Sequence, residues 1–356
     1  MSHDLLSREN SKIMRGIAIL SIMLHNLLHN PVFGLSKENE MSYNQNLSDS
    51  FLNVLASGDT HIVAELISFL GWVGVPVFVF LTGYGLAQKY PPPSSAIDKR
   101  KYLCHNYLKL FFLMLPAILF FIVGDIEDRE WIRIVKKLFA LTMLHNFDYP
   151  HLKINPSIYW YFSLTFQYYV FFLFFRKYLN GRNLLILSVL SMICLYVLGQ
   201  SGWDNAMSIY RHCFTGWFPL FALGIWWSDR NLQGWMWNTN LAVETFLFIG
   251  LLALLVLMSL NCMSWIFIPL IALGWFWCAT RMLMRSIILS QLFRWVGCYS
   301  AFIFVCHPIA RTFFLRLHME SMGVVMSIVL FVILTFALCY PYKILYTRLM
   351  RKFIKV

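Results

Sequence analysis

The chain has 356 residues, of which 59% are hydrophobic and only 13% charged, so it lacks the polar surface that a soluble protein of this length needs. Its net charge of +12 would suit nucleic acid, but in so apolar a chain it better fits the Lys and Arg surplus of cytoplasmic loops. No nucleic-acid partner is therefore predicted. Because no stretch is polar enough for a soluble domain, we expect one multi-pass domain over residues 1–356, embedded in a lipid bilayer, with no appended soluble domain.

Ten apolar stretches approach the roughly 20 residues that a membrane-spanning helix needs. They cover residues 13–33, 62–90, 105–124, 157–175, 183–199, 208–227, 240–259, 263–280, 296–317 and 322–346. The apolar segment 131–147 is interrupted by Arg133, Lys136 and Lys137, so we expect an amphipathic helix at the interface there. The predicted fold is an all-α bundle of about ten transmembrane helices.

The distribution of basic residues predicts the orientation of this bundle. If the N-terminus is inside, 20 of the 29 Lys and Arg residues fall in cytoplasmic segments, which predicts that both termini are cytoplasmic. The two long outer segments, 34–61 and 125–156, are then predicted to be lids or rims, and the Pro-rich run 91–95 a cytoplasmic connector.

The eight cysteines and the N-terminal region exclude several other classes. No two cysteines form a CxxC pair and most lie in apolar stretches, which argues against zinc and disulfide frameworks, so no metal is expected. The first apolar stretch contains His25 and His29 and lacks a small-residue cleavage site, which argues against a signal peptide.

Ionisable side chains inside the first predicted helix are candidates for function. Arg15 lies near its cytoplasmic end, and His25 follows ten residues later, about 15 Å along the helix and near the middle of the ~30 Å hydrocarbon layer. Ala18, Ser21, His25 and His29 share one face, which indicates a polar stripe toward the bundle interior. A histidine that is merely bonded to a neighbouring helix, with Arg15 as an interfacial anchor, would give the same pattern.

The ninth predicted helix places a second histidine at a similar depth. His307 lies about eleven residues from the cytoplasmic entry, and Pro308 directly after it removes a helical hydrogen bond and predicts a kink. Such a kink would open polar backbone to a substrate. An ordinary proline kink beside a satisfied histidine is the alternative.

The fourth predicted helix presents Trp160, Ser163 and Gln167 on one face. Stacking by Trp and directional hydrogen bonds from an amide would suit a sugar. A helix in the aromatic belt of the membrane would show the same composition.

Five motifs occur in a fixed order along the chain. They are residues 15–20 followed by His25, residues 71–84, residues 160–169, Arg211 ahead of residues 218–224, and residues 292–300 followed by His307 and Pro308. In this order the motifs resemble the family-3 membrane acyltransferases, which O-acylate cell-surface carbohydrates in bacteria. The resemblance covers nearly the whole chain. It implies a multi-pass protein of the bacterial plasma membrane that transfers an acyl group, with acetyl expected, from acetyl-CoA or another acyl-CoA to a carbohydrate or lipid-linked glycan.

The resemblance also implies roles for individual residues. His25 would be the catalytic histidine, as a base or an acyl carrier, and His307 a second catalytic or acceptor-side group. The donor would be bound by Arg15, Lys109 and Arg100, and the acceptor by Trp160, Gln167 and Arg211.

The chain departs from the family pattern at three places. Asn106 and Lys109 stand where the family has two arginines, and Lys does not replace Arg in bidentate phosphate binding, so the donor is expected to contact Lys99, Arg100 and Lys101 instead. Thr165 replaces a glutamate, for which Glu65 is a substitute by position only, and Thr82 replaces a serine.

These departures keep two alternatives open. One is a transporter of a polysaccharide, a lipid-linked sugar or an acyl group, because intramembrane histidines also serve proton relays. The other is a scaffold subunit without catalysis.

Overall fold

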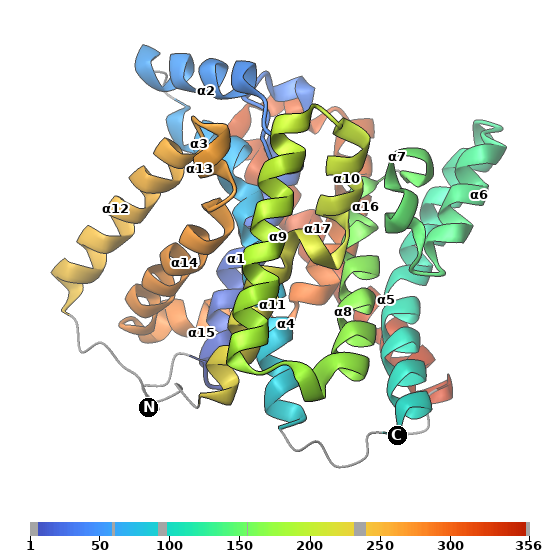
Figure 1. Ribbon diagram of the computed structural model, residues 1–356. Helices are drawn as coiled ribbons and strands as arrows, with labels where there is room; N and C mark the ends of the chain where they lie inside the picture. The colour runs from blue at the N-terminus through green and yellow to red at the C-terminus, as the bar shows by residue number, and fades with distance from the viewer. Residues whose placement is uncertain (1–5, 59–60, 92–97, 155, 231–239, 354–356) are drawn as a thin grey trace.

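The computed structural model describes residues 6–58, 61–91, 98–154, 156–230 and 240–353, and over these residues it contains helices and no strands (Figure 1). The larger helices are α1 (Asn10–Leu28), α2 (Gln45–Ser57), α3 (Ile62–Leu70), α4 (Val75–Lys89), α5 (Lys99–Glu127), α6 (Trp131–Ala140), α8 (Trp160–Phe175), α9 (Gly181–Ser201), α10 (Asp204–His212), α11 (Phe218–Asp229), α12 (Leu241–Met258), α14 (Ile268–Met284), α15 (Ile287–Cys298), α16 (Ser300–Arg316) and α17 (Val324–Phe353). Short helices include η2 (Gly71–Gly74), η3 (His145–Asp148), α7 (Tyr149–Leu152), η6 (Phe214–Trp217), α13 (Cys262–Trp265) and η8 (Met319–Met322).

Seven helical segments within the described residues are long and apolar enough to cross a membrane, and an eighth is present if the bent pair α15–α16 is one span. All ten predicted stretches are helical, but two of them do not pass as single spans. Stretch 208–227 is divided into α10, η6 and α11, and stretch 263–280 corresponds to the 17-residue α14. The predicted count of about ten is therefore not confirmed.

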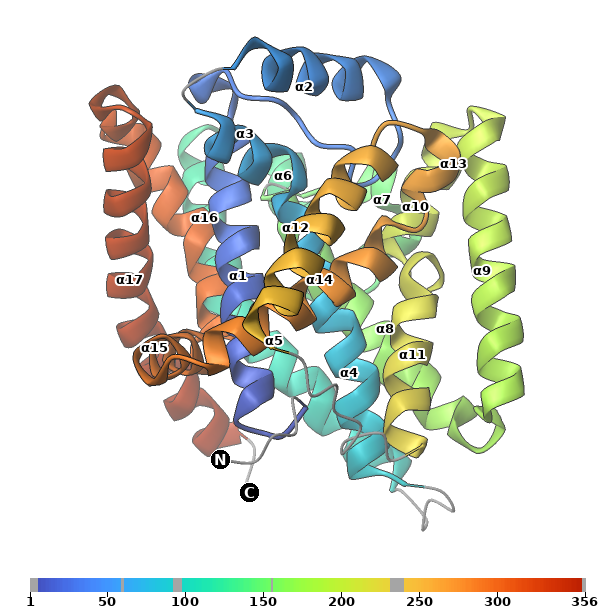
Figure 2. The ribbon, with the colours of Figure 1, turned by 90° about the vertical axis from the view of Figure 1, so that its left-hand side faces the viewer.

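The span predicted at 296–317 begins differently from the prediction. α15 and α16 meet at an angle of 73°, so the crossing part begins at Ser300, and α15 lies across the lower part of the molecule (Figure 2). α15 exposes Ile287, Ile288 and Leu292, as expected for a helix that lies along a membrane surface.

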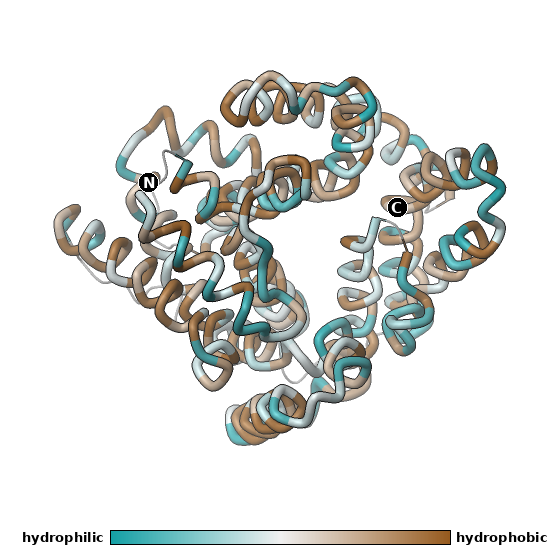
Figure 3. The backbone as a smooth tube through the Cα atoms, turned by 90° about the horizontal axis from the view of Figure 1, so that it is seen from above, coloured by the Kyte–Doolittle hydropathy of each residue, from teal (hydrophilic) through white to brown (hydrophobic). Residues whose placement is uncertain are grey.

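Burial separates a central layer of helices from a peripheral one. The most apolar windows of α1 and of the α3–α4 segment are 61% and 72% buried, whereas those of α9 and α12 are 17% and 11% buried. Seen from above, hydrophobic residues extend along most of the helices (Figure 3). Helices that are apolar on all sides yet exposed are what a lipid solvent requires.

Two glycines allow α4 and α11 to cross in close contact. A Cβ at Gly83 would collide with the backbone of Phe221, and a Cβ at Gly224 with the backbone of Phe80. Small residues permit such backbone approach where helices pack inside a membrane. This crossing fixes α4, which forms one wall of the cavity described below.

The first spanning helix begins, and the last one ends, at the same end of the molecule (Figures 1 and 2), as an even number of crossings requires. α2 lies at the opposite end, in the predicted outer segment 34–61.

In the other outer segment, α6 is shorter than the predicted 131–147. It exposes Trp131, Ile132 and Val135 and buries Lys137 in an ion pair with Asp125. Most of the predicted connector at 91–95 lies outside the described residues.

Candidate functional site

A cavity of about 980 Å³ is enclosed by the segment before α1 together with α1, α4, α5, α8 and α16. This volume lies at the upper end of the range for small-molecule sites, so the cavity can hold a large ligand. The segment before α1 and the last turn of α4 line one end of the cavity, which we call the mouth. The cavity therefore begins at the end of the molecule where the basic residues of the predicted cytoplasmic side lie.

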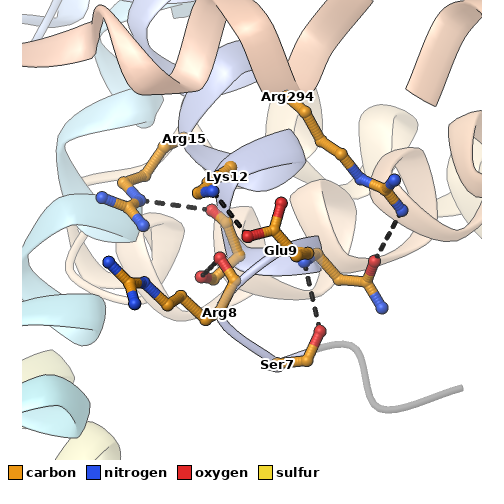
Figure 4. A network of polar contacts seen from close by, with 8 residues as sticks. Ser7, Arg8, Glu9, Lys12, Arg15 and Arg294 are labelled. Carbon is orange, nitrogen blue, oxygen red and sulfur yellow. Dashed lines mark hydrogen bonds and ion pairs between the residues drawn. The ribbon is translucent and has the colours of Figure 1, made fainter. Parts of the chain in front are cut away.

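Four cations line the mouth of the cavity: Arg8, Arg15, Lys89 and Lys109. None of them forms an ion pair with a carboxylate of the described residues, whereas the neighbouring Lys12 is paired with Glu9 at 2.6 Å. Figure 4 shows the Arg8 and Arg15 guanidinium groups beside one another, and Arg15 Nε donates to the Ser11 carbonyl at 3.4 Å. Uncompensated cations at one end of a cavity form a site for a polyanion such as a phosphate group.

Deeper inside, the cavity becomes apolar. Ile19 and Ile22 of α1 continue the face that carries Arg15, and Phe78, Tyr161 and Phe304 approach from the other helices. The cavity thus combines a cationic mouth with an apolar interior, which is the chemistry of a long amphipathic ligand whose charge is at one end.

His25 lies one turn beyond Ile22 and is buried. Its Nδ1 lies 2.8 Å from the carbonyl oxygen of Ser68. Because a carbonyl only accepts, Nδ1 must carry the proton, and in the neutral ring Nε2 is then the basic nitrogen. Gly71 packs against the His25 side chain so closely that a Cβ there would lie 2.5 Å from the His25 Cβ. The ring is therefore oriented by contacts with α3 and η2.

His307 lies one turn beyond Phe304 on α16, in the same relation to the cavity as His25. Its Nδ1 lies 2.9 Å from the Ile303 carbonyl, so its Nε2 is also the basic nitrogen. This Nε2 atom is buried and has no hydrogen-bond partner among the described residues. Arg311 on the next turn donates to the Asn26 carbonyl at 2.7 Å and ties α16 to α1. Both histidines are therefore buried one helical turn beyond residues that line the cavity, and neither of them lines it.

On the outer side, residues 36–40 form a strap beside His25 and His29, and side chains of three helices, α3, α10 and α13, hold it. Trp265 Nε1 donates to the Asn39 carbonyl at 2.6 Å, and Arg211 donates to the Glu40 carbonyl at 2.6 Å. Glu65, the suggested substitute for the missing family glutamate, accepts the backbone N–H of Ser36 at 2.9 Å. Glu65 therefore holds the strap and does not line the cavity.

The three predicted acceptor-binding residues are all buried, and none lines the large cavity. The Arg211 guanidinium lies 4.2 Å and 4.9 Å from the rings of Trp217 and Trp265. Burial lowers the pKa of Arg211 to about 10, so it stays charged near neutral pH. Gln167 accepts the backbone N–H of Phe214 at 2.9 Å. Trp160 stacks on Trp217, with ring centres 6.0 Å apart. These side chains hold the outer wall together through contacts within the protein.

Of the predicted donor contacts, Arg15 and Lys109 line the cavity, whereas Arg100 is exposed and does not. Lys99 and Lys101 are exposed as well. Lys89 and Arg8 also line the mouth, although the sequence pattern did not select them as donor-binding residues. Their position could have indicated this role, because both are basic residues at the cytoplasmic ends of predicted spans. Thr82 and Thr165 also line the cavity, so three of the four positions that depart from the family pattern (Thr82, Lys109 and Thr165) line it, whereas Asn106 does not.

The fold and this site define a multi-pass membrane protein with a deep, charged cavity that ends near two histidines. A model of the acyltransferase family 3 domain matches residues 9–344. The chain therefore belongs to the family 3 acyltransferases and is a membrane acyltransferase. No curated protein and no solved structure matches the chain significantly.

Proposed function

We propose that the protein takes an acyl group, with acetyl expected, from acyl-CoA on the cytoplasmic side of the bacterial plasma membrane. It transfers this group to a hydroxyl of an exported or cell-surface carbohydrate. The observation that supports this is the 980 Å³ cavity, which has cations at its mouth and apolar walls at depth and stops one helical turn short of both buried histidines. A coenzyme A thioester has the matching form, with phosphates at one end, a long thin arm, and the reacting carbonyl at the other end.

The dimensions of the site agree with this donor. Arg15 and His25 lie ten residues apart on one helix, so the phosphate contacts and the chemistry are separated by about 15 Å. In this proposal, Arg8, Arg15, Lys89 and Lys109 hold the phosphates. The arm lies along Ile19 and Ile22, and the thioester reaches His25.

The transfer uses the free nitrogen of His25. Nε2 takes the proton of the acceptor hydroxyl while the oxygen attacks the thioester carbonyl carbon. The carbon–sulfur bond breaks, and the thiolate takes the proton from the imidazolium, which restores neutral His25 and releases the free thiol. The hydrogen bond that Nδ1–H of His25 donates to the Ser68 carbonyl keeps the neutral ring in the tautomer with a free Nε2 before and after the transfer. His307 presents a second unoccupied Nε2, which in this proposal binds the acceptor hydroxyl.

Thiol release from acyl-CoA, measured together with acylation of a glycan acceptor, tests the proposal. Purified protein should release the thiol of acetyl-CoA and acylate the acceptor in equal amounts, and cells that lack the gene should lose an acyl group from one surface glycan. Movement of a sugar or polymer across proteoliposomes without thiol release would support the transporter instead. An unchanged acyl pattern on every surface glycan would contradict the proposed acceptor.

A further inference from the structure

A second group of ligating side chains lies on the outer side of His25. His25, His29 and Glu38 each offer one nitrogen or oxygen atom, and these atoms all lie within 4.8 Å of one another. His29 Nδ1 is 3.0 Å from the Glu38 carboxylate, and the two imidazole rings have centres 5.3 Å apart. Transfer of the acyl group, as proposed above, uses only His25 of these three.

The three residues come from two elements that the structure holds firmly in place. His25 and His29 are four residues apart and share one face at the outer end of α1. Glu38 lies in the strap of residues 36–40, which is fastened by Glu65, Ser68, Trp265 and Arg211. The strap therefore keeps the Glu38 carboxylate close to both imidazoles, nine residues after His29 in the chain.

We propose that His25, His29 and Glu38 bind a divalent transition-metal ion of the Zn²⁺ class. Two imidazoles and one carboxylate are a common ligand set for Zn²⁺, with a fourth position left for water. His25 meets a further requirement of such ligands. Its Nδ1–H is bonded to a backbone carbonyl, which leaves Nε2 as the coordinating atom and fixes the ring orientation.

The exposure of the three ligands and the nearby Arg311 determine how a metal ion reaches the site and how tightly the site binds it. His29 and Glu38 side chains are 34% and 19% exposed, whereas His25 is buried, so the ion would enter from the outer side. The Arg311 guanidinium lies within electrostatic range of both histidines, but it is directed to the Asn26 carbonyl. This cation weakens the affinity for a metal without blocking a ligand atom.

Metal binding at this site has a consequence for the activity, and this part of the inference rests on the proposed function. An ion on Nε2 of His25 removes the lone pair that would accept the proton of the hydroxyl. External Zn²⁺ is thus expected to inhibit acyl transfer reversibly, and chelation should restore it.

The direct test measures Zn²⁺ binding to the purified, untagged full-length protein by equilibrium dialysis without any substrate. We expect one equivalent of Zn²⁺ per chain. We expect H29Q and E38Q to weaken binding at least about tenfold, because even loss of an outer-shell partner typically costs 10–100-fold. H318Q is the matched control, because His318 and Glu320 form another outer His–carboxylate pair at 3.2 Å, to which the described residues add no third ligand. Equal binding by the wild type, H29Q and E38Q would overturn the site.

Co²⁺ provides a readout that does not depend on whether the variants fold. Its visible absorption is intense when the ion has four ligands and weak when it is octahedral and hydrated. The wild type should show the intense spectrum, and a weak spectrum at saturating Co²⁺ would overturn the proposal. The metal site and the proposed function fail separately. Zn²⁺ binding by a protein that, when metal-free, releases no thiol from acyl-CoA would refute only the transferase, and acyl transfer that saturating Zn²⁺ leaves unchanged would refute only the inhibition.

Discussion

His25 and His307, the two histidines to which we assign the chemistry, are buried and have defined tautomers. His25 and His307 each bond a backbone carbonyl through Nδ1, at 2.8 Å and 2.9 Å, so each presents a basic Nε2. A backbone acceptor cannot become protonated or change its role. The arrangement therefore keeps both rings ready for proton transfer whatever the state of the neighbouring side chains.

Substitution of His25 should remove this chemistry. We expect His25→Ala to lower kcat for acyl transfer by about 10²–10⁴-fold, the usual contribution of a positioned general base. A greater loss would indicate that the histidine also carries the acyl group. His318→Ala, at an exposed position on the outer side, is the control and should retain the wild-type kcat. Full acyl transfer by a folded His25→Ala protein would exclude the proposed base.

The cations of the mouth should act on binding of the donor. We expect Arg15→Gln and Lys109→Gln each to raise KM for acyl-CoA about tenfold, because a hydrogen bond to a charged group contributes about 1.5–3 kcal/mol. Arg100→Gln should leave KM unchanged, because Arg100 is exposed and outside the cavity. Initial rates at varied acyl-CoA concentration give KM for each variant. If Arg100→Gln raised KM as much as Arg15→Gln, the phosphate-binding site would have to include the N-terminal end of α5.

At the scale of elements, the site depends on how closely α1 approaches η2. Gly71 and Gly74 face α1, and a Cβ at either position would collide with the backbone or side chains of that helix. α3, which directly precedes η2, carries the Ser68 carbonyl that orients His25. Packing of α1 against α3 and η2 therefore determines the position of the His25 ring.

Gly71→Ala tests this control. The added methyl would lie 2.5 Å from His25 Cβ and 2.9 Å from the Ser21 carbonyl oxygen, so we expect a loss of about 1–3 kcal/mol in stability together with a lower kcat. Gly250→Ala on α12 is the control, because no atom lies within 4 Å of the added Cβ there. Unfolding midpoints and kcat measured in detergent should change for Gly71→Ala only; an unaffected Gly71→Ala protein would show that α1 and η2 are not packed this closely.

The elements also show how far the sequence could predict the structure. Apolar length predicts helices at all ten stretches, because a bilayer allows little else. The sequence predicts one span over 208–227, whereas α10 and α11 are separate helices; at the break Gln167 accepts the Phe214 backbone N–H, a contact between residues distant in sequence that apolar length does not reveal. For the site, spacing on a single helix was sufficient to select Arg15 and His25. The burial of Arg211 between two tryptophans could not be predicted, because Trp, Gln and Arg can bond either a sugar or the protein itself.

In the molecule as a whole, the proposed transfer from a cytoplasmic donor to an exported acceptor requires that the mouth and the strap lie on opposite sides of the membrane. Ser50 on α2 and Arg182 on α9 are exposed positions at the two ends. In a background where the exposed Cys104, Cys194 and Cys298 are serine, we expect an impermeant maleimide to label Ser50→Cys in intact cells. Arg182→Cys should be labelled only after permeabilisation. The reverse pattern would invert the proposed topology.

In the proposed reaction, a donor bound at one membrane face acylates a hydroxyl presented from the other. Sealed proteoliposomes that contain the glycan acceptor inside and receive labelled acyl-CoA only outside separate the two faces. We expect acylated glycan inside and an equal amount of free thiol outside, and His25→Ala should abolish both. Acylation that occurs only when donor and acceptor share one compartment would exclude transfer across the membrane.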